Sequence, residues 1–339
     1  MTTQRAIIVQ EPGQAILAYD IPIPQLPDEY ILVKAKSVAL NTTDWRHIDY
    51  LPCGGAILGC DYAGTVETKG DRVADFVHGC DAVRPGGGAF AEYVIAKGDL
   101  QIHIPDSMNS DAAATLSVGL TTVGQNLYQI LPLPFPATSE ATSSDDSILI
   151  YGGATATGSL AIQLAKMSGL RVVTTCSDAN RSFMYELGAD AVFDYHDAKV
   201  GQQIRDDTED ALELVLDTIS SPQSVATCSA ALSSSGGSYN ALLDVQCARE
   251  DVDSHVSMAY DILGEPYQIG TKTYSPGMQD PEFGIRWWNC AQTWLQNRRL
   301  VPHPHQLKPG GLIGVLNGLQ MMRKGKVRAR KPVYRVDNV

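Results

Sequence analysis

The chain has 339 residues, 44% of them hydrophobic and 19% charged, which is ordinary globular composition and enough length for two hydrophobic cores. Its formal net charge of -12 excludes a broad phosphate-binding surface, so we expect no nucleic acid partner. The N-terminus shows neither a signal-peptide core nor a membrane span, which predicts a cytoplasmic protein without membrane contact.

The first third of the sequence predicts a β-rich domain. Short β-type runs at 6–9, 30–39, 71–74 and 90–95 are separated by turns rich in proline and glycine. Arg46 and His47 follow the stretch 41–45 at the end of a β run, where a position facing a nicotinamide and a plain surface loop are equally compatible with the sequence. Ser110 and Asp111 then form a helix cap for a predicted helix over 112–131, and an exposed loop follows over 132–146.

From residue 147 onwards, strands alternate with helices, which predicts βαβ units on a parallel sheet. The expected strands are 148–151, 170–176, 191–195 and 212–217, and the expected helices are 159–168 and 181–187. Beyond residue 250 the pattern weakens, with helices over 283–297 and 311–324 and a closing strand over 331–336. The fold class is therefore α/β, with a β-rich catalytic domain over 1–122, completed by about 290–339, and a doubly wound dinucleotide-binding domain over 123–289.

The turn 151–158 is the strongest cofactor signal. It lies between a predicted strand and a predicted helix, where free backbone NH groups and the positive helix end bind a pyrophosphate. Gly152 and Gly158 hold the outer positions of a Gly-x-x-Gly-x-x-Gly pattern, but Thr155 replaces the middle glycine. A turn that needs glycine for its geometry alone is the minor alternative.

The end of the second strand of this domain bears on the choice of cofactor. An NAD site usually has an acidic side chain there for the ribose 2′-hydroxyl, whereas Ser177, Asn180 and Arg181 are suited to a 2′-phosphate. The sequence favours NADPH on this ground. Asp178 opposes this if its carboxylate faces the ribose, while a role as a helix cap is at least as compatible with the sequence.

The seven cysteines are scattered and form no Cys-x-x-Cys pair, which favours buried free thiols over a disulfide framework. A catalytic zinc needs three converging ligands, and none of the available spacings is a recognised ligand pattern, so we expect no metal. The possible ligands considered are His47, Cys53, Cys60, His78, His303 and His305.

Several of these stretches resemble the zinc-independent medium-chain dehydrogenase/reductase superfamily, in which a GroES-like catalytic domain accompanies a Rossmann domain. The stretches are 41–45 (NTTDW), 58–66 (LGCDYAGTV), 70–73 (GDRV), 87–93 (GGAFAEY) and 186–195 (ELGADAVFDY). Within the superfamily the chain is most similar to fungal trans-acting enoyl reductases, on 151–157 (YGGATAT), 175–177 (TCS), 193–195 (FDY) and 323–326 (RKGK).

This resemblance implies an NADPH-dependent oxidoreductase of secondary metabolism. It would reduce the α,β-double bond of an enoyl thioester held on the acyl carrier domain of a highly reducing polyketide synthase, either alone or as a synthase–peptide synthetase hybrid. Hydride transfer to the β-carbon gives an enolate, which needs hydrogen-bond donors until the α-carbon is protonated. Members of the family are expected to be monomers.

The resemblance also implies site residues. The expected catalytic residues are Arg46 and Thr122. The expected cofactor-binding residues are Asp44, Trp45, Arg46, His47, Ala154, Thr155, Ala156, Thr157, Ser177, Asp178, Ala179, Asn180, Tyr195, Leu242, Leu243, Arg328 and Ala329. The expected substrate-binding residues are Val123, Gly124, Gln125, Asn126, Leu127, Tyr128, Gln129, Ile130, Ala259, Tyr260, Asp261, Ile262 and Leu263.

Two departures from the family pattern and two alternative functions remain open. Arg46 stands where the family often has lysine, and an arginine orients charge but is a poor proton source. The segment 66–70 is shorter than usual, as a trimmed loop or an altered docking site. The alternatives are a reductase of free quinones or alkenals and a catalytically idle companion that stabilises a synthase. Two interpretations apply to the basic residues near the C-terminus: a patch that docks the carrier domain, or a solvated face. These residues are Arg323, Lys324, Lys326, Arg328, Arg330 and Lys331.

Overall fold

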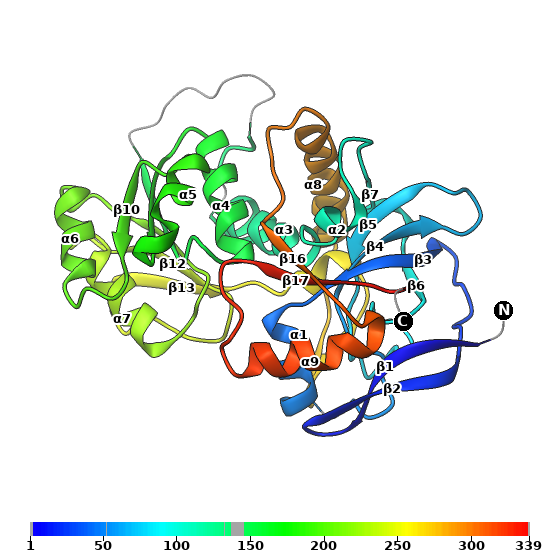
Figure 1. The fold of residues 1–339 in the computed structure, drawn as a ribbon. Helices are drawn as coiled ribbons and strands as arrows, with labels where there is room; N and C mark the ends of the chain where they lie inside the picture. The colour runs from blue at the N-terminus through cyan, green and yellow to red at the C-terminus, as the bar shows by residue number, and fades with distance from the viewer. Residues whose placement is uncertain (1–2, 52, 132, 137–145, 338–339) are drawn as a thin grey trace. The chain divides into compact units, whose positions relative to one another are not determined.

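The computed structural model describes residues 3–51, 53–131, 133–136 and 146–337 (Figure 1). The chain divides into two compact units: unit 1 comprises residues 1–118 and 260–339, and unit 2 comprises residues 119–259. The sequence places the return to the first domain near residue 290, whereas the chain re-enters unit 1 at Tyr260. No helix in the described part of the chain is long and apolar enough to span a bilayer.

Unit 1 is built on a mostly antiparallel sheet in the order β16-β17-β3-β4-β5-β7, with β6 paired to β3, and a separate hairpin, β1-β2. The strands are β1 (Thr3–Glu11), β2 (Gln14–Pro22), β3 (Tyr30–Ala39), β4 (Asp61–Val66), β5 (Arg72–Phe76), β6 (Tyr93–Lys97), β7 (Ile102–His103), β16 (His305–Lys308) and β17 (Lys331–Arg335). The predicted β-rich character of this part is confirmed. The 66–70 segment is a tight turn, closed by a hydrogen bond from Gly70 N to Val66 O.

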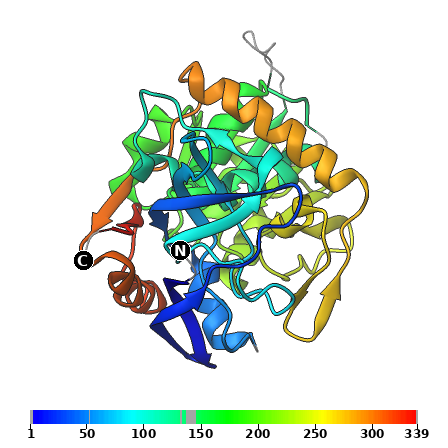
Figure 2. The same ribbon diagram turned by 90° about the vertical axis from the view of Figure 1, so that its right-hand side faces the viewer.

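The helices of unit 1 are α1 (Thr42–Tyr50), α2 (Ser110–Ala113), α8 (Gln279–Gln296) and α9 (Gly311–Arg323). A short hairpin, β14 (Tyr267–Ile269) and β15 (Lys272–Tyr274), leads into α8, which is the long orange helix of Figure 2. Trp287 and Trp294 on α8 are buried and meet edge to face, which anchors the helix to the core of the unit.

The helix α1 corrects the expectation of a β-run end or a surface loop around residue 45. Asn41 and Asp44 form a capping box: the Asn41 side chain accepts from the N3 backbone, and the Asp44 carboxylate accepts from Asn41 N at 2.6 Å. These paired bonds satisfy the free NH groups at the helix start. The residues expected near the nicotinamide therefore lie on a helix, where their spacing decides which of them share a face.

Unit 2 is a parallel sheet in the order β10-β9-β8-β11-β12-β13, with a helix in each chain connection from β8 to β12 and a helix-free connection from β12 to β13. Its strands are β8 (Ser147–Tyr151), β9 (Arg171–Cys176), β10 (Ala191–Asp194), β11 (Leu214–Asp217), β12 (Gly237–Ala241) and β13 (Val252–Val256). Its helices are α4 (Ala156–Met167), α5 (Arg181–Glu186), α6 (Val200–Asp207) and α7 (Pro222–Ala231). The predicted doubly wound sheet is confirmed. The central strands are buried on both faces, as a parallel sheet covered by helices requires.

The single helix predicted over 112–131 is wrong in detail. The chain instead forms α2, then α3 (Ser117–Gly124), then a π-helical turn (Gln125–Ile130). Asn109, not Ser110, caps α2, because its side chain accepts from Ala112 N at 2.8 Å. Asp111 is buried and pairs with Arg335 instead. Most of the predicted loop over 132–146 lies outside the described residues.

The expectation of free thiols throughout is also wrong at two positions. Cys53 and Cys80 form a disulfide, with Cα atoms 5.6 Å apart and a sequence separation of 27. Cys60, Cys176, Cys228, Cys247 and Cys290 are free. A pairing of this kind depends on how the loop after α1 meets the segment after β5, which residue spacing does not reveal.

Candidate cofactor and catalytic residues

In unit 2 the candidate cofactor residues gather at the carboxyl ends of the strands. Strand order reverses between β8 and β11, because β9 and β10 lie on one side of β8 while β11 to β13 lie on the other. Open α/β sheets bind ligands in the crevice at such a switch point. The turn after β8, Thr218 after β11 and Leu242 after β12 all lie at this edge.

The turn after β8 brings the backbone close to neighbouring groups. Gly152 has a φ of 83°, which favours glycine, and a Cβ on Gly158 would lie 2.4 Å from Gly152 O. A side chain at either position would therefore disturb the turn. The backbone is left bare at the start of α4, as a cradle for a diphosphate requires.

The Thr155 side chain accounts for the absence of the middle glycine from this loop. Thr155 is the N-cap of α4, and its hydroxyl accepts from Gly158 N at 2.9 Å. The same hydroxyl lies 2.9 Å from the hydroxyl of Thr218. The NH groups of Ala156 and Thr157, the first two of the helix, have no intrahelical acceptor by construction. They suit an anion at the positive end of the helix, so the residues of this turn fit a dinucleotide.

The region after β9 bears on the ribose end of a cofactor. Asn180 Nδ2 donates to Ser177 Oγ at 3.1 Å, and Tyr195 N donates to Cys176 O at 3.4 Å, which brings Tyr195 beside the end of β9. Arg181 Nε donates to the Asp178 carboxylate at 3.1 Å, in an exposed pair. The Asp178 charge is therefore partly compensated, and Asp178 does not cap α5, whose N-cap is Asn180.

Leu242 and Leu243 follow β12. Leu242 N donates to Ser220 Oγ at 2.8 Å, and the Asp217 carboxylate accepts from Ser224 Oγ and Tyr239 Oη at 2.6 and 2.7 Å. These buried bonds fix the edge of the sheet on the β11 side. No signal in the sequence pointed to Thr218 or Asp217, because each acts by supporting a neighbouring turn.

In unit 1 the candidate residues lie on α1. Asp44 and His47 are buried, whereas Trp45 and Arg46 are partly exposed. The Arg46 guanidinium lies over the Trp45 ring, 5.6 Å from its centroid, and Arg46 Nε is buried without a hydrogen-bond partner among the described residues. A buried donor without an acceptor is costly, so Arg46 is suited to an acceptor supplied by a ligand.

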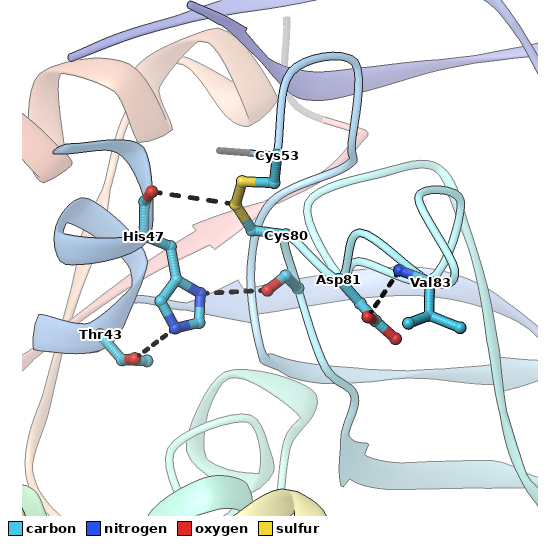
Figure 3. The surroundings of a disulfide bond; sticks show 7 residues. Thr43, His47, Cys53, Cys80, Asp81 and Val83 are labelled. Atoms are coloured by element: carbon cyan, nitrogen blue, oxygen red, sulfur yellow. Dashed lines mark hydrogen bonds between the residues drawn. A yellow bond between two sulfur atoms is a disulfide. The ribbon is translucent and has the colours of Figure 1, made fainter. Parts of the chain in front are cut away.

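The hydrogen bonds of His47 define its tautomer (Figure 3). His47 Nδ1 lies 3.0 Å from Gly79 O, a carbonyl that only accepts, so Nδ1 carries the hydrogen. His47 Nε2 then accepts from Thr43 Oγ1 at 2.9 Å. Burial lowers the pKa of His47 to about 4, so the ring is neutral at neutral pH. The segment that carries Gly79 continues into the disulfide-bonded Cys80.

A buried cluster surrounds this histidine. The Tyr260 ring stacks on His78 with centroids 3.7 Å apart, and Tyr260 Oη lies 3.6 Å from Cys60 Sγ. Burial raises the pKa of Asp44 to about 7 and raises the pKa values of Cys60 and Tyr260 well above their ordinary values. Sequence reasoning weighed Cys60 and His78 only as metal ligands and missed the cluster, because its members come from four distant segments.

The predicted substrate residues divide between the units. Thr122 lies on α3, two residues before its end, and Thr122 O accepts from Asn126 Nδ2 at 2.8 Å. Asn126 also donates to Ser257 Oγ at 2.7 Å, and Gln125 donates to Met258 O at 3.0 Å. The polar side chains of the π-helical turn therefore hold unit 2 together. Such turns are frequent at functional sites, and the assignment of 123–130 to the acyl channel stays a prediction.

The segment Ala259–Leu263 is a 3-10 helix in which Tyr260 and Ile262 are buried. Asp261 accepts from Tyr267 Oη at 2.7 Å. Arg328 and Ala329 lie in the connection before β17. Their roles and those of the other candidates stay predictions.

Two of the six basic C-terminal residues form ion pairs, while Lys324, Lys326, Arg328 and Arg330 are exposed. Lys331 is buried and pairs with the buried Asp61 carboxylate, and it donates to Thr115 O at 3.3 Å. Arg323 pairs with Asp49. Within the described ranges, no group of three or more His, Cys, Asp or Glu side chains is placed to hold a metal ion.

Comparison with known proteins assigns the family. Residues 27–106 match the alcohol dehydrogenase GroES-like domain family, and residues 156–240 match the zinc-binding dehydrogenase family. The trans-enoyl reductase resD of Aspergillus sclerotiorum is 46% identical, covering 98% of this chain and 100% of that protein. This chain belongs to the fungal trans-enoyl reductases. The trans-enoyl reductase ACTTS2 of Alternaria alternata is 43% identical, covering 99% of this chain and 100% of that protein.

Solved structures agree on the fold of this trans-enoyl reductase family member. A putative zinc-dependent alcohol dehydrogenase from Rhizobium etli has a TM-score of 0.80 at 19% identity, covering 100% of both chains. The mycobacterial protein Rv1454c, solved with NADPH, has a TM-score of 0.74 at 21% identity, covering 98% of this chain and 99% of that one. The predicted combination of a GroES-like domain with a Rossmann domain is confirmed. The protein is an oxidoreductase of the medium-chain superfamily.

Proposed function

We propose that this protein is a trans-acting enoyl reductase that uses NADPH to reduce the α,β-double bond of a polyketide enoyl thioester carried by a partner polyketide synthase. The observation that carries the proposal is 46% identity to the trans-enoyl reductase resD over 98% of this chain. When bound, the reduced nicotinamide supplies the hydride for the β-carbon. The residues of this chain bind the cofactor, orient the substrate and hold the charge that develops.

The turn of unit 2 and the start of α4 support the cofactor assignment. Ala154, Ala156 and Thr157 would hold the pyrophosphate through backbone NH groups at the positive helix end, and Thr155, whose NH donates to Gly152 O at 3.0 Å, would shape the turn around it. Ser177 and Asn180 offer a hydroxyl and an amide to a 2′-phosphate, and Arg181 already pairs with Asp178. Because Arg181 partly neutralises the Asp178 carboxylate, this carboxylate would repel the 2′-phosphate of NADPH less strongly.

Arg46 is the residue proposed to hold the enolate oxygen. Its buried Nε, which has no acceptor in the described structure, offers a charge-assisted hydrogen bond to an oxyanion. Arg46→Ala should lower kcat by about 100-fold, the loss typical of one oxyanion donor. Turnover in this variant equal to that of the wild type would remove the role from Arg46.

A substrate panel tests the proposed function. NADPH oxidation is followed with a short α,β-unsaturated acyl pantetheine thioester, and with a quinone and the saturated thioester as comparisons. NADPH-dependent turnover of the enoyl thioester alone supports the proposal, whereas turnover of the quinone alone would assign the protein to free small molecules. Titration of both cofactors should give a lower Kd for NADPH than for NADH.

A further inference from the structure

The carboxyl ends of β9 and β10 lie side by side in unit 2, at the edge where the cofactor ribose is expected. Asp194, the last residue of β10, is in register with Cys176, the last residue of β9, and Tyr195 N donates to Cys176 O at 3.4 Å. Ser177 and Asn180, the two candidates for the 2′-phosphate, follow β9 directly. The first residues after β10 therefore lie beside the first residues after β9.

His196 is the second residue after β10, and a carboxylate fixes the orientation of its ring. His196 Nδ1 lies 2.6 Å from Asp194 Oδ1, and His196 N donates to the same oxygen at 3.0 Å. Because a carboxylate only accepts, Nδ1 carries the hydrogen, and Nε2 is the nitrogen left for another partner. The ring also packs on Tyr195, with the ring centroids 4.1 Å apart. These two contacts hold the imidazole in one orientation.

The Nε2 atom of His196 is open to a ligand. No hydrogen bond within the described residues involves this atom, and 62% of the side chain is exposed to solvent. When the ring is protonated, both of its nitrogens donate, so Nε2–H offers a charge-assisted hydrogen bond to an anion. A phosphate oxygen is a suitable acceptor for such a donor.

The charged side chains at this edge carry one more negative than positive charge while His196 is neutral. Arg181 Nε donates to Asp178 Oδ1 at 3.1 Å, and the same guanidinium donates to a backbone carbonyl of β10, so it lies between the two strand ends. The charged residues after the two strands and at the end of β10 are Asp178, Arg181, Asp194, Asp197 and Lys199. Three carboxylates against two cations leave one negative charge, which protonation of His196 compensates.

We propose that His196 is a further cofactor-binding residue, whose protonated ring donates from Nε2 to the 2′-phosphate and so raises the preference of the enzyme for NADPH over NADH. This inference rests on the proposed function, which assigns NADPH as the cofactor. NADPH differs from NADH only in the 2′-phosphate, a group with about 1.5 to 2 negative charges at neutral pH. An uncompensated carboxylate repels this group, whereas a protonated His196 attracts it. His196 is then a specificity-determining residue, and Asp194 is a positioning residue that orients its ring.

Two substitutions at position 196 test the role of the charge. His196→Gln keeps a polar side chain and removes the positive charge, whereas His196→Arg keeps a positive charge at every working pH. The matched control is His255→Gln, because His255 is an exposed histidine on β13, at the other edge of the same sheet. The readouts are the Kd of NADPH, the Kd of NADH, and the protons taken up on binding, measured by calorimetry in two buffers of different ionisation enthalpy.

His196→Gln should raise the Kd of NADPH by about 3- to 10-fold, the range for one hydrogen bond to a charged group at an exposed site. The Kd of NADH should be unchanged, because NADH has no 2′-phosphate to contact. NADPH binding to the wild type should take up protons at about pH 7.5, since the phosphate favours the protonated ring. This uptake should be absent with NADH, and it should be lost in His196→Gln and His196→Arg. His255→Gln should resemble the wild type in every readout.

The inference also predicts how the cofactor preference changes with pH. The protonated ring is the binding form, so the preference for NADPH should be greatest at about pH 6.5 and should fall towards about pH 8.5. Burial raises the pKa of the Cys176 thiol at the end of β9 to about 11, so this thiol stays neutral. Carboxylates, phenols and the cations of lysine and arginine keep their charge state over this range as classes. The other groups at this edge that belong to these classes are Asp178, Arg181, Asp194, Tyr195, Asp197 and Lys199. In His196→Gln and His196→Arg the preference should therefore not depend on pH.

The possible outcomes separate this inference from the proposed function. If the wild type prefers NADPH and His196→Gln keeps the same preference, the inference is wrong and the assignment of NADPH stands. Equal rises in the Kd of NADPH and of NADH also contradict it, because they indicate a general disturbance of the cofactor site. If the wild type binds both cofactors equally, the assignment of NADPH fails and the inference fails with it. Reduction of the enoyl thioester is measured separately, so a failure there would overturn the proposed reaction while the binding results still decide the role of His196.

Discussion

The two units build their candidate sites in different ways. In unit 2 the candidate cofactor site uses backbone atoms of one turn, 151–158, with Thr155 and Thr218 as supports. In unit 1 the buried cluster around His47 consists of titratable side chains drawn from distant parts of the chain, such as Asp44 and Tyr260. Binding a diphosphate needs local backbone geometry, whereas shifting a pKa needs desolvation by many contacts. The backbone geometry is determined by a short stretch of sequence, whereas the desolvation depends on the whole fold.

The largest expected effect concerns the buried ion pair of unit 1. Lys331→Met leaves the Asp61 carboxylate buried and unpaired, so the free energy of unfolding should fall by about 3–5 kcal/mol. Urea unfolding measures this loss. The control is Lys36→Met, which breaks the exposed Lys36–Asp337 pair and should cost less than about 1 kcal/mol. Equal losses in the two variants would mean that the burial of the pair is unimportant.

The disulfide of unit 1 should contribute somewhat less to the free energy of unfolding than the Lys331–Asp61 ion pair. Cys53 and Cys80 close a loop of 27 residues, and the double variant Cys53→Ala/Cys80→Ala should lose about 3 kcal/mol of unfolding free energy. Thiol titration of the denatured, unreduced protein should detect the five free cysteines, against seven after reduction. The pairing is contradicted if all the thiols react before reduction.

In unit 2 the test is whether cofactor binding needs the close backbone approach in the turn 151–158. Gly158→Ala brings a Cβ to within 2.4 Å of Gly152 O, so the turn must shift and the Kd of NADPH should rise by about 10- to 100-fold, or about 1.4–2.8 kcal/mol. Gly119→Ala is the control, because its nearest neighbour, the Leu160 side chain, would lie 3.5 Å from the new Cβ. Unchanged binding in Gly158→Ala would show that the close approach is not needed for the cofactor.

The smallest effect concerns the helix cap. Thr155→Ala removes the acceptor for Gly158 N, at a cost of about 1 kcal/mol in unfolding free energy. Thr155→Ser keeps the hydroxyl and should restore most of this stability, as measured by urea unfolding. If alanine and serine behave alike, the cap does not account for the replacement of the middle glycine.

The contrast between the units also explains what the sequence predicted. The βαβ order of unit 2 and the turn 151–158 follow from alternating patterns and glycine spacing, which are local properties. The helix α1 was missed, although Asn41 followed by Asp44 at the third helical position is a capping-box signal. A predicted helix over 112–131 was broken into three pieces because local periodicity does not reveal where tertiary contacts interrupt it.

Side-chain partnerships across long stretches of sequence lay beyond local patterns. Lys331 was grouped with surface cations, yet it pairs with Asp61, 270 residues away. Cys60 was considered as a metal ligand, yet its neighbour is Tyr260. Each of these contacts exists only after the sheet of unit 1 has formed, so residue type and spacing alone do not identify it.

The most direct test of the account uses one reaction. The wild-type protein is incubated with NADPH and the enoyl-loaded carrier of the intact partner synthase, and the mass of the released acyl group is measured. The account predicts that the acyl group gains two hydrogens and NADPH is oxidised in equal amount, with little reaction when NADH replaces NADPH. An acyl group of unchanged mass, with NADPH bound but not oxidised, would contradict the proposed enoyl reductase function.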